Sequence, residues 1–139
     1  IDGSSVAMAL KVASEAADSA VMKPVEGTIL TVVREAASGA AGSSGELVDV
    51  LEAALLAAEI ALARTPEQLE ILATAGVVDA GGAGFLHLLH GMLQVADGRA
   101  LPEAVSQPEI PNVFKPVSSA DLTGELRYEV MYRLDAPDS

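Results

Sequence analysis

The chain has 139 residues, of which 50% are hydrophobic and 3% aromatic, and it contains no Cys. Its formal net charge of −12 makes nucleic acid and anionic membrane surfaces poor partners, because both would repel it. The lack of Cys excludes disulfides, thiolate catalysis and Cys-ligated zinc. A core with so few aromatic side chains must be built from Ala, Leu, Val and Ile, which favours closely packed helices over a β-sandwich.

Two further features concern the chain as a whole. No apolar run is long enough to span a membrane and no signal peptide is visible, so we expect no membrane span and a cytoplasmic location. The chain begins with Ile1 and has no initiator Met, so we expect it to be a piece of a longer protein.

The first predicted helix covers 5–21, with Ser4 or Ser5 as its N-cap. Hydrophobic residues recur at helical spacing on one face, and polar residues occupy the other. The apolar face comprises Val6, Leu10, Ala13, Ala17 and Val21, and the polar face comprises Lys11, Ser14, Glu15 and Asp18.

Pro24 and Gly27 interrupt this pattern. A second helix is expected over 28–41, with Thr28 as its N-cap. A third helix is expected over 46–63, and its wide apolar stripe predicts a position at the centre of a bundle. The stripe consists of Leu47, Val50, Leu51, Ala54, Leu55, Ala58 and Leu62, and Leu56 and Ile60 add a second apolar side.

Thr65, Pro66 and Glu67 form a helix start signal, because Thr caps, Pro suits the first turn and Glu meets the positive end of the helix dipole. We therefore expect a fourth helix that begins at Thr65 and ends near Gly76.

A fifth helix is expected after the glycine-rich stretch 79–84, and it should end at Asp97 and Gly98. A short extra turn is expected over 101–105. The residues of the fifth helix that should point inward are Phe85, Leu86, Leu89, Leu93 and Ala96.

The chain changes character after these helices. Pro and Ser residues over 106–124 indicate an extended linker. Alternating charged and apolar residues over 125–134 indicate a strand, which either begins a following domain over 125–139 or pairs with a neighbouring molecule. We therefore predict an all-α helical domain over 1–105, an antiparallel bundle followed by a linker and one β-strand.

Two helix starts carry the residues of chemical interest, and the first is the stretch 22–31. Free N–H groups at a helix N-terminus suit a phosphate oxygen, to which Lys23 would add a positive charge and Thr28 a hydroxyl. Gly27 permits an unusual backbone conformation just before the helix. Taken by itself, such a start is more often an ordinary cap.

The second helix start is the Asp-Ala-Gly-Gly-Ala-Gly stretch at 79–84. Small residues let a ligand approach the backbone closely. The stretch is no Walker loop, because no Gly-Lys-Ser/Thr follows, and no Rossmann fingerprint, because the βαβ context is missing. Asp79 either caps the helix or contacts a ribose hydroxyl, and the cap is the simpler interpretation.

Two other sets of polar residues are better explained by their helices. His87 and His90 are spaced for one helix face, but no carboxylate at a matching position completes a metal site. Glu46, Asp49 and Glu52 are expected near a helix start because of the dipole. We therefore predict no metal-ligating and no catalytic residue in this chain.

Together, the two glycine-containing stretches resemble the family of fatty acid kinase ATP-binding subunits. The resemblance rests on Lys-Pro-Val-Glu-Gly-Thr-Ile-Leu-Thr-Val-Val-Arg-Glu-Ala-Ala at 23–37 and Val-Val-Asp-Ala-Gly-Gly-Ala-Gly-Phe-Leu at 77–86. Residues 127–138 resemble the start of that family's middle domain. The N-terminal domain of this family is similar to the L subunit of dihydroxyacetone kinase, an eight-helix barrel that binds Mg-ATP, and the chain would correspond to the second half of that DhaL-like barrel.

The resemblance implies a nucleotide site made by both loops. The matching residues are Lys23, Glu26, Gly27 and Thr28 in the loop that closes over the nucleotide, and Asp79, Gly81 and Gly82 in a loop that lines its pocket. The Asp-rich loop that holds magnesium in these proteins has no match in 1–21. We therefore expect ATP and Mg²⁺ to be cofactors of the intact protein, with neither firmly bound to this chain.

The implied reaction is transfer of the ATP γ-phosphate to a fatty acid carboxylate held by a separate acyl-binding partner protein. The chain alone should be inactive, so whether it is itself an enzyme stays open. A dihydroxyacetone-kinase-like phosphotransferase with another acceptor is an alternative, because fold does not fix the acceptor. A helical interaction module without nucleotide is a second alternative. Exposed core surface of half a barrel would predict a homodimer of this chain.

Overall fold

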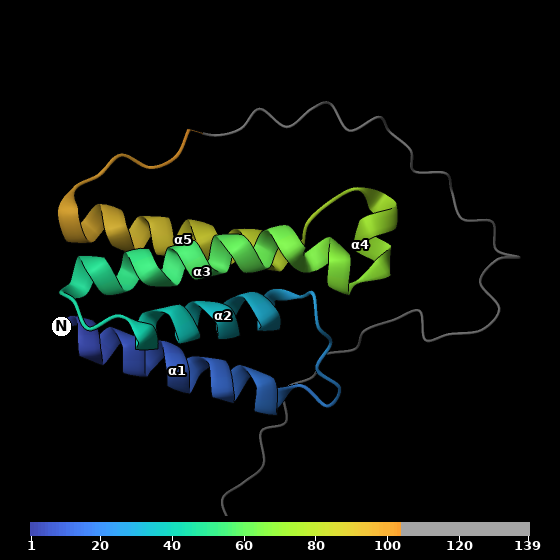
Figure 1. Ribbon diagram of the computed structural model, residues 1–139, viewed down its shortest axis with the longest axis horizontal. Helices are drawn as coiled ribbons and strands as arrows, with labels where there is room; N and C mark the ends of the chain where they lie inside the picture. The colour runs from blue at the N-terminus through green and yellow to red at the C-terminus, as the bar shows by residue number, and fades with distance from the viewer. Residues whose placement is uncertain (104–139) are drawn as a thin grey trace, which may run out of the picture. The chain divides into compact units, whose positions relative to one another are not determined.

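The computed structural model describes residues 1–103, which contain five α-helices (Figure 1). The helices are α1 (Gly3–Ala20), α2 (Ile29–Gly42), α3 (Leu47–Gln68), α4 (Glu70–Ala75) and α5 (Ala80–Asp97). No strand occurs in this part of the chain, so the all-α prediction is confirmed for it. The predicted linker over 106–124 and the strand over 125–139 lie outside the described residues.

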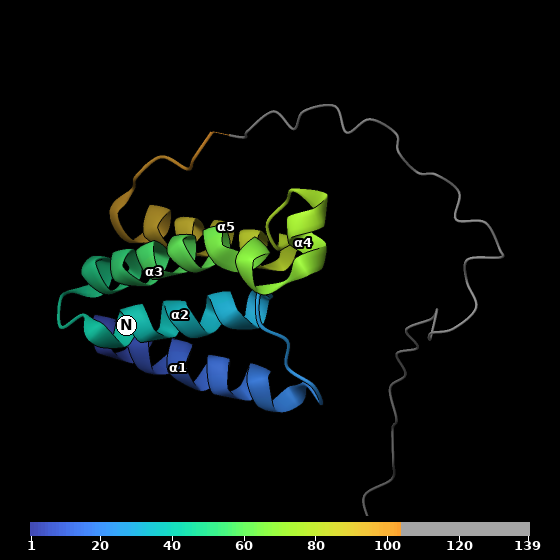
Figure 2. The same cartoon turned by 45° about the vertical axis from the view of Figure 1, so that its right-hand side comes forward.

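Two of the four long helices, α2 and α3, form a central pair. α2 and α3 pack against each other, and α1 and α5 each pack against both, whereas the backbones of α1 and α5 do not approach each other closely. Successive long helices run in opposite directions, as Figures 1 and 2 show, so the starts of α2 and α5 lie at the same end of the bundle. α4 packs beside the C-terminal end of α3.

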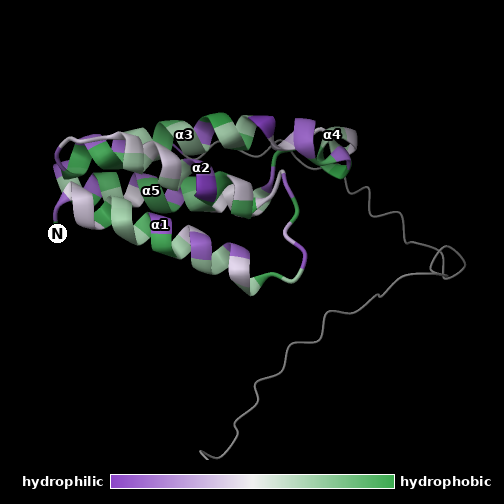
Figure 3. Cartoon of the chain, turned by 60° about the horizontal axis from the view of Figure 1, so that its bottom comes forward, coloured by the Kyte–Doolittle hydropathy of each residue, from purple (hydrophilic) through white to green (hydrophobic). Residues whose placement is uncertain are grey.

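Small residues build the core between α2 and α3. The fully buried side chains of this interface are mostly Ala and Val, among them Val32, Ala36, Val50 and Ala54. A Cβ atom on Gly39 would lie only 2.5 Å from the carbonyl oxygen of Ala53, so the two backbones approach very closely there. The predicted core of aliphatic residues and the central position of α3 are both confirmed. Figure 3 shows hydrophobic segments on every long helix, interrupted by hydrophilic ones.

The start of α1 differs from the prediction. Asp2, not Ser4 or Ser5, is the N-cap, and its carboxylate accepts a hydrogen bond of 2.8 Å from the backbone N–H of Ser5. The Ser4 hydroxyl donates to the same oxygen at 3.0 Å. These hydrogen bonds, the backbone bond from Ser5 first, lower the pKa of Asp2 to about 2. Because the Asp2 carboxylate accepts hydrogen bonds from both serines, Asp2 is a better N-cap than either of them, and the helix begins at Gly3.

The buried face of α1 is also rotated relative to the prediction. Ser14, expected on the polar face, is buried, whereas Ala13 is exposed. At Gly3, a Cβ atom would lie 2.8 Å from Cγ2 of Val50 on α3. The glycine therefore lets the start of α1 pack closely against α3.

The prediction of a helix start at Thr65 was wrong. α3 continues through Pro66 to Gln68, and the break comes at Leu69, which has an extended backbone. Pro66 has no N–H to donate to the carbonyl of Leu62, one turn earlier. The hydroxyl of Thr65 donates to that carbonyl instead, at 2.8 Å, and so keeps the helix intact. The end of α4 at Gly76, with φ of +67°, was predicted correctly.

The prediction for α5 is largely confirmed. Asp79 is its N-cap, and the helix ends at Asp97 with Gly98 in the left-handed conformation. Leu89 and Leu93 are fully buried, but Ala96 is exposed, because the last turn extends beyond the core. No helical turn forms at 101–103, and the rest of the predicted turn at 101–105 lies outside the described residues.

The side of α3 formed by Leu56 and Ile60 faces outward, with exposed fractions of 60% and 55%. None of the helices in residues 1–103 has the length and apolar character that crossing a bilayer requires.

Candidate functional site

Both glycine-containing loops lie at the same end of the bundle. The first precedes α2 and the second precedes α5, and the two helices touch at their first turns. A Cβ atom on Gly81 would lie 3.1 Å from the Cβ atom of Ile29, the first residue of α2. Residues 23–28 and 79–82 are therefore brought together, although about fifty residues separate them in the sequence. Two helix N-termini that face the same end favour an anion there.

The first loop is held from behind by a chain of hydrogen bonds. The backbone N–H of Gly27 donates to the Thr31 hydroxyl at 3.0 Å, and that hydroxyl donates to the carboxylate of Glu26 at 2.7 Å. Nη2 of Arg34 donates to the same carboxylate oxygen at 2.5 Å. Nη1 of Arg34 lies 3.9 Å from Oδ2 of Asp18 on α1. The Arg34 hydrogen bond, and after it that of Thr31, lowers the pKa of Glu26. Glu26 thus fastens the loop to α2.

The conformation of Gly27 is required by this arrangement. Its φ of +79° lies in the left-handed region, which side chains other than glycine rarely adopt. A Cβ atom there would also lie 2.9 Å from the carbonyl oxygen of Thr65 and 3.0 Å from Cβ of Gln68, both on α3. The loop therefore rests directly on the last turn of α3.

Lys23 and Thr28 are placed differently from Glu26. Lys23 is exposed. Thr28 is the N-cap of α2, as predicted, but its hydroxyl donates to the carbonyl of Val25 at 2.8 Å and makes no side-chain cap bond. The side chain of Thr28 therefore does not occupy the first-turn amides of α2.

The second loop is organised by Asp79. Its carboxylate accepts a hydrogen bond of 2.6 Å from the N–H of Gly82, which is the capping interaction that the sequence predicted. Gly82 is buried between Val32 of α2 and Leu62 of α3, whereas Gly81 is exposed at the helix start. Both glycines thus permit close packing of α5, Gly82 against α2 and α3 and Gly81 against Ile29, but only Gly81 is exposed to solvent.

Thr65 connects the two loops, and the sequence analysis missed this role. Its side chain is fully buried. The hydroxyl accepts a hydrogen bond from the backbone N–H of Asp79 at 3.1 Å, and the carbonyl oxygen lies against Gly27. The only local signal in the sequence is the Thr-Pro pair at the end of a long apolar helix, a pattern that also fits a helix start. Arg34 was missed as well, because nothing in the sequence links it to Glu26, eight residues earlier.

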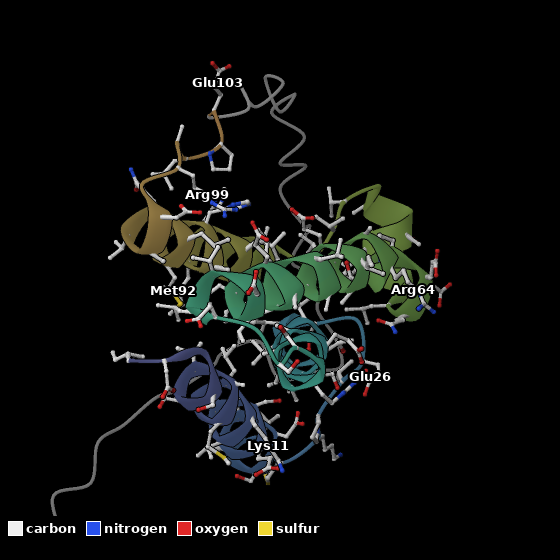
Figure 4. The ribbon with its side chains drawn as sticks, turned by 60° about the vertical axis from the view of Figure 1, so that its left-hand side comes forward. Lys11, Glu26, Arg64, Met92, Arg99 and Glu103 are labelled. Carbon is white, nitrogen blue, oxygen red and sulfur yellow. The ribbon has the colours of Figure 1, made fainter. Side chains whose placement is uncertain are left out.

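Three cationic side chains lie near this end, and two of them are paired with carboxylates: Arg34 with Glu26, and Arg64 with Glu67. Of the five Lys and Arg residues in 1–103, Lys23 and Arg34 belong to the first loop or contact it, and Arg64 lies in the last two turns of α3. Figure 4 shows Glu26 and Arg64 on the same side of the bundle. Arg34 and Arg64 line a cavity of about 270 Å³ between α2 and α3, directly behind the first loop.

A larger apolar groove lies away from the loops. It has a volume of about 750 Å³ and runs between the start of α1, the start of α3 and the second half of α5. Met92, labelled in Figure 4, lies in its wall, and Leu47 and Leu51 form the part contributed by α3. The groove is not part of the site at the two glycine loops.

The two other sets of polar residues named from the sequence, the early acids of α3 and the histidines of α5, do not form a metal-binding site in the described residues. Asp49 accepts a hydrogen bond of 2.9 Å from the N–H of Glu46, so these acids cap α3. His87 is exposed and His90 half-buried on α5. Within residues 1–103, no three His, Asp or Glu side chains come close enough together to hold a metal ion.

Comparison with known proteins identifies the family. Residues 1–94 match the model of the DAK2 domain. Protein YloV of Bacillus subtilis is 38% identical over 141 residues, which cover 93% of this chain and 26% of YloV. The uncharacterized protein SH1689 of Staphylococcus haemolyticus is 39% identical over 104 residues, 73% of this chain and 19% of its own length.

The uncharacterized protein SAUSA300_1119 of Staphylococcus aureus is 40% identical over 96 residues, 67% of this chain and 18% of its own length. The chain thus spans about a quarter or less of these relatives. The family model matches both glycine loops and all five helices except the end of α5. The chain therefore belongs to the DAK2 domain family.

Proposed function

We propose that this chain is the nucleotide-site portion of a DhaL-like kinase domain, and that its two glycine loops contact the phosphates of ATP in the intact protein. The observation that carries the proposal is the meeting of two glycine-containing helix starts, Gly27-Thr28 and Asp79 to Gly82, at one end of a DAK2-domain bundle. Helix N-termini bind phosphate oxygens through free N–H groups and the positive end of the dipole.

Some residues of the two loops are accessible to the nucleotide phosphates, and others hold the loops in place. Lys23 and Gly81 are exposed, so an ammonium group and an open backbone are available to an anion. Thr28 leaves the first amides of α2 free of its side chain. Glu26, Asp79 and Gly82 take the supporting role, because their polar or packing surfaces already have partners.

A net charge of −12 disfavours a polyanionic nucleotide, so the proposal requires a divalent cation. The described residues contain no cluster that fits Mg²⁺. The metal ligands would then come from other parts of the longer protein, and the chain alone would bind ATP weakly or not at all. When bound, Mg²⁺ neutralises phosphate charge, and this chain's loops position the phosphates.

The acceptor is the part of the proposal that rests on resemblance alone. A fatty acid carboxylate, held by an acyl-binding partner protein, would attack the γ-phosphorus of ATP, and the bond to ADP would break to give an acyl phosphate. A dihydroxyacetone-kinase-like enzyme with another acceptor would use the same loops. The same proposal includes a cytoplasmic location. It also includes a half-barrel whose exposed core surface associates with a second copy of the chain.

Calorimetric titration of Mg-ATP tests the proposal. The 139-residue chain and a longer polypeptide with the flanking sequence of the parent protein are titrated under identical conditions. Binding to the longer polypeptide, abolished by Gly81→Trp at the exposed helix start, is the expected result. If neither form binds Mg-ATP, the kinase proposal fails and a helical interaction module without nucleotide becomes the better account.

A further inference from the structure

One buried residue contacts both glycine loops, and it belongs to neither. Thr65 lies near the C-terminal end of α3 with no exposed surface. Its carbonyl oxygen accepts the regular helix bond from Leu69 at 3.0 Å and lies 2.9 Å from where a Cβ atom on Gly27 would be. Its side-chain oxygen accepts the N–H of Asp79. One face of this residue therefore meets the first loop, and its side chain meets the second.

The hydrogen bonding of the Thr65 hydroxyl is matched to Pro66, the residue that follows it. A proline inside a helix leaves the carbonyl one turn earlier, here that of Leu62, without its regular donor. The Thr65 hydroxyl donates a hydrogen bond to the carbonyl oxygen of Leu62 at 2.8 Å. In this orientation, a lone pair of the hydroxyl oxygen accepts the hydrogen bond from the N–H of Asp79 at 3.1 Å. The direction of the hydroxyl is thus fixed at both ends.

The hydrogen bonds continue from Thr65 into the start of α5. Asp79 receives its position from Thr65 through its backbone N–H, and its carboxylate then holds the N–H of Gly82 at 2.6 Å. Gly82 packs against Val32 of α2. A displacement of Asp79 would therefore move the first turn of α5 relative to α2, and with it the alignment of the two helix starts.

We propose that Thr65 is a positioning residue for the nucleotide site: its hydroxyl sets the second glycine loop against the last turn of α3, on which the first loop rests. The inference rests on the proposed function, because it names a residue that aligns the same two loops. Thr65 itself is buried and does not contact the nucleotide. Since buried polar atoms that lose a partner are costly, the alignment depends on the hydroxyl and not on the size of the side chain.

The first test compares Thr65→Val with Thr65→Ser by amide hydrogen exchange in the 139-residue chain. Valine keeps the shape and loses both hydrogen bonds, whereas serine keeps them. Exchange at the Asp79 and Gly82 amides should become about tenfold faster in T65V and stay close to wild type in T65S. Unchanged exchange at Asp79 in T65V would overturn the inference. This readout needs no nucleotide.

The second test separates positioning from stability. In the double variant T65V/P66A, the new N–H at position 66 can donate to Leu62, so the helix regains a bond while Asp79 still lacks its acceptor. Exchange at Asp79 should remain fast in the double variant even where global stability recovers. Recovery of slow exchange would mean that Thr65 acts only through the integrity of α3, which contradicts the proposal.

The third test is the Mg-ATP dissociation constant of the longer polypeptide. T65V should weaken binding about tenfold and T65S should restore it. Faster loop exchange with unchanged affinity would refute the positioning role. If the wild-type polypeptide binds no Mg-ATP, the proposed function fails, while the exchange measurements still decide whether Thr65 holds the loop.

Discussion

Gly82 of α5 lies directly against Val32 of α2: a Cβ atom on the glycine would be 2.8 Å from Cγ2 of the valine. The same atom would be 3.0 Å from Cδ1 of Leu62 on α3. Gly82 therefore marks a close approach of the start of α5 to α2 and α3. The packing explains the glycine without any ligand, and it places the second glycine loop beside α2.

Substitution of Gly82 by alanine should destabilise the chain by about 1–2 kcal/mol. Overpacking costs about 1–3 kcal/mol, and the better helix propensity of alanine returns up to about 1 kcal/mol. The β-branched Val32 has little freedom to move away. Urea denaturation of G82A and wild type measures the difference.

Gly84→Ala is the matched control in the same helix. No atom lies within 4 Å of a Cβ atom at Gly84, so G84A should be neutral or stabilise by up to about 1 kcal/mol. Equal stability changes in the two variants would mean that Gly82 does not mark a close approach.

Gly27→Ala should destabilise the chain more than Gly76→Ala does. Both glycines have positive φ, +79° and +67°, so both variants carry a backbone strain of about 1–2 kcal/mol. Only Gly27 also contacts Thr65, Gln68 and Leu69, whereas nothing lies within 4 Å of a Cβ atom at Gly76. The difference between the two variants in thermal or urea unfolding isolates the contact between the first loop and α3, and a zero difference would contradict that contact.

The sequence predicted the elements whose signals are local. The cap at Asp79, the ends at Gly76 and Gly98, and the two loops all depend on residues within a few positions of each other. The buried face of α1 depends on its packing against α2 and α3, including the approach of Gly3 to Val50, which no local pattern encodes. Pro66 was misread for the same reason, because its tolerance inside α3 depends on the orientation of one neighbouring hydroxyl.

The candidate site divides in the same way. Its members could be named from the two glycine-rich stretches, but their roles could not. The resemblance places Glu26 in the nucleotide loop, and the structure adds that its carboxylate accepts hydrogen bonds from Thr31 and Arg34. Which side chains are free to meet a ligand follows from hydrogen bonds between elements, and these appear only when the helices are packed.

The homodimer stays a prediction, and the apolar groove is the surface on which we expect the second copy to pack. Met92 is 39% exposed in the groove wall, so Met92→Glu should convert dimers into monomers in sedimentation velocity experiments. Leu56→Glu is the control, because Leu56 is 60% exposed on α3 and does not line the groove. A wild-type chain that stays monomeric at high concentration would contradict self-association.

Protonation of Glu26 should loosen the first loop in acid. The pKa of this carboxyl is lowered from its ordinary 4.5 by Arg34 and then Thr31, so the folded state binds the proton less readily than the unfolded chain. The contribution of Glu26 to stability is therefore fully present above about pH 4.5 and is lost as the pH falls through the lower folded pKa. Because the Glu26 side chain is 58% exposed, the effect should stay below about 1 kcal/mol.

Glu26→Gln tests this dependence, since glutamine can accept the same hydrogen bonds but cannot be protonated in this range. The stability advantage of wild type over E26Q, measured by urea unfolding, should shrink as the pH is lowered from neutral toward 3. It should also shrink at high salt, because the partner Arg34 is partly exposed and its attraction is screened. Glu15→Gln is the comparison, because Glu15 meets Lys11 only at 4.0 Å on the surface of α1. A difference between wild type and E26Q that does not change with pH would mean that the charge of Glu26 does not hold the loop.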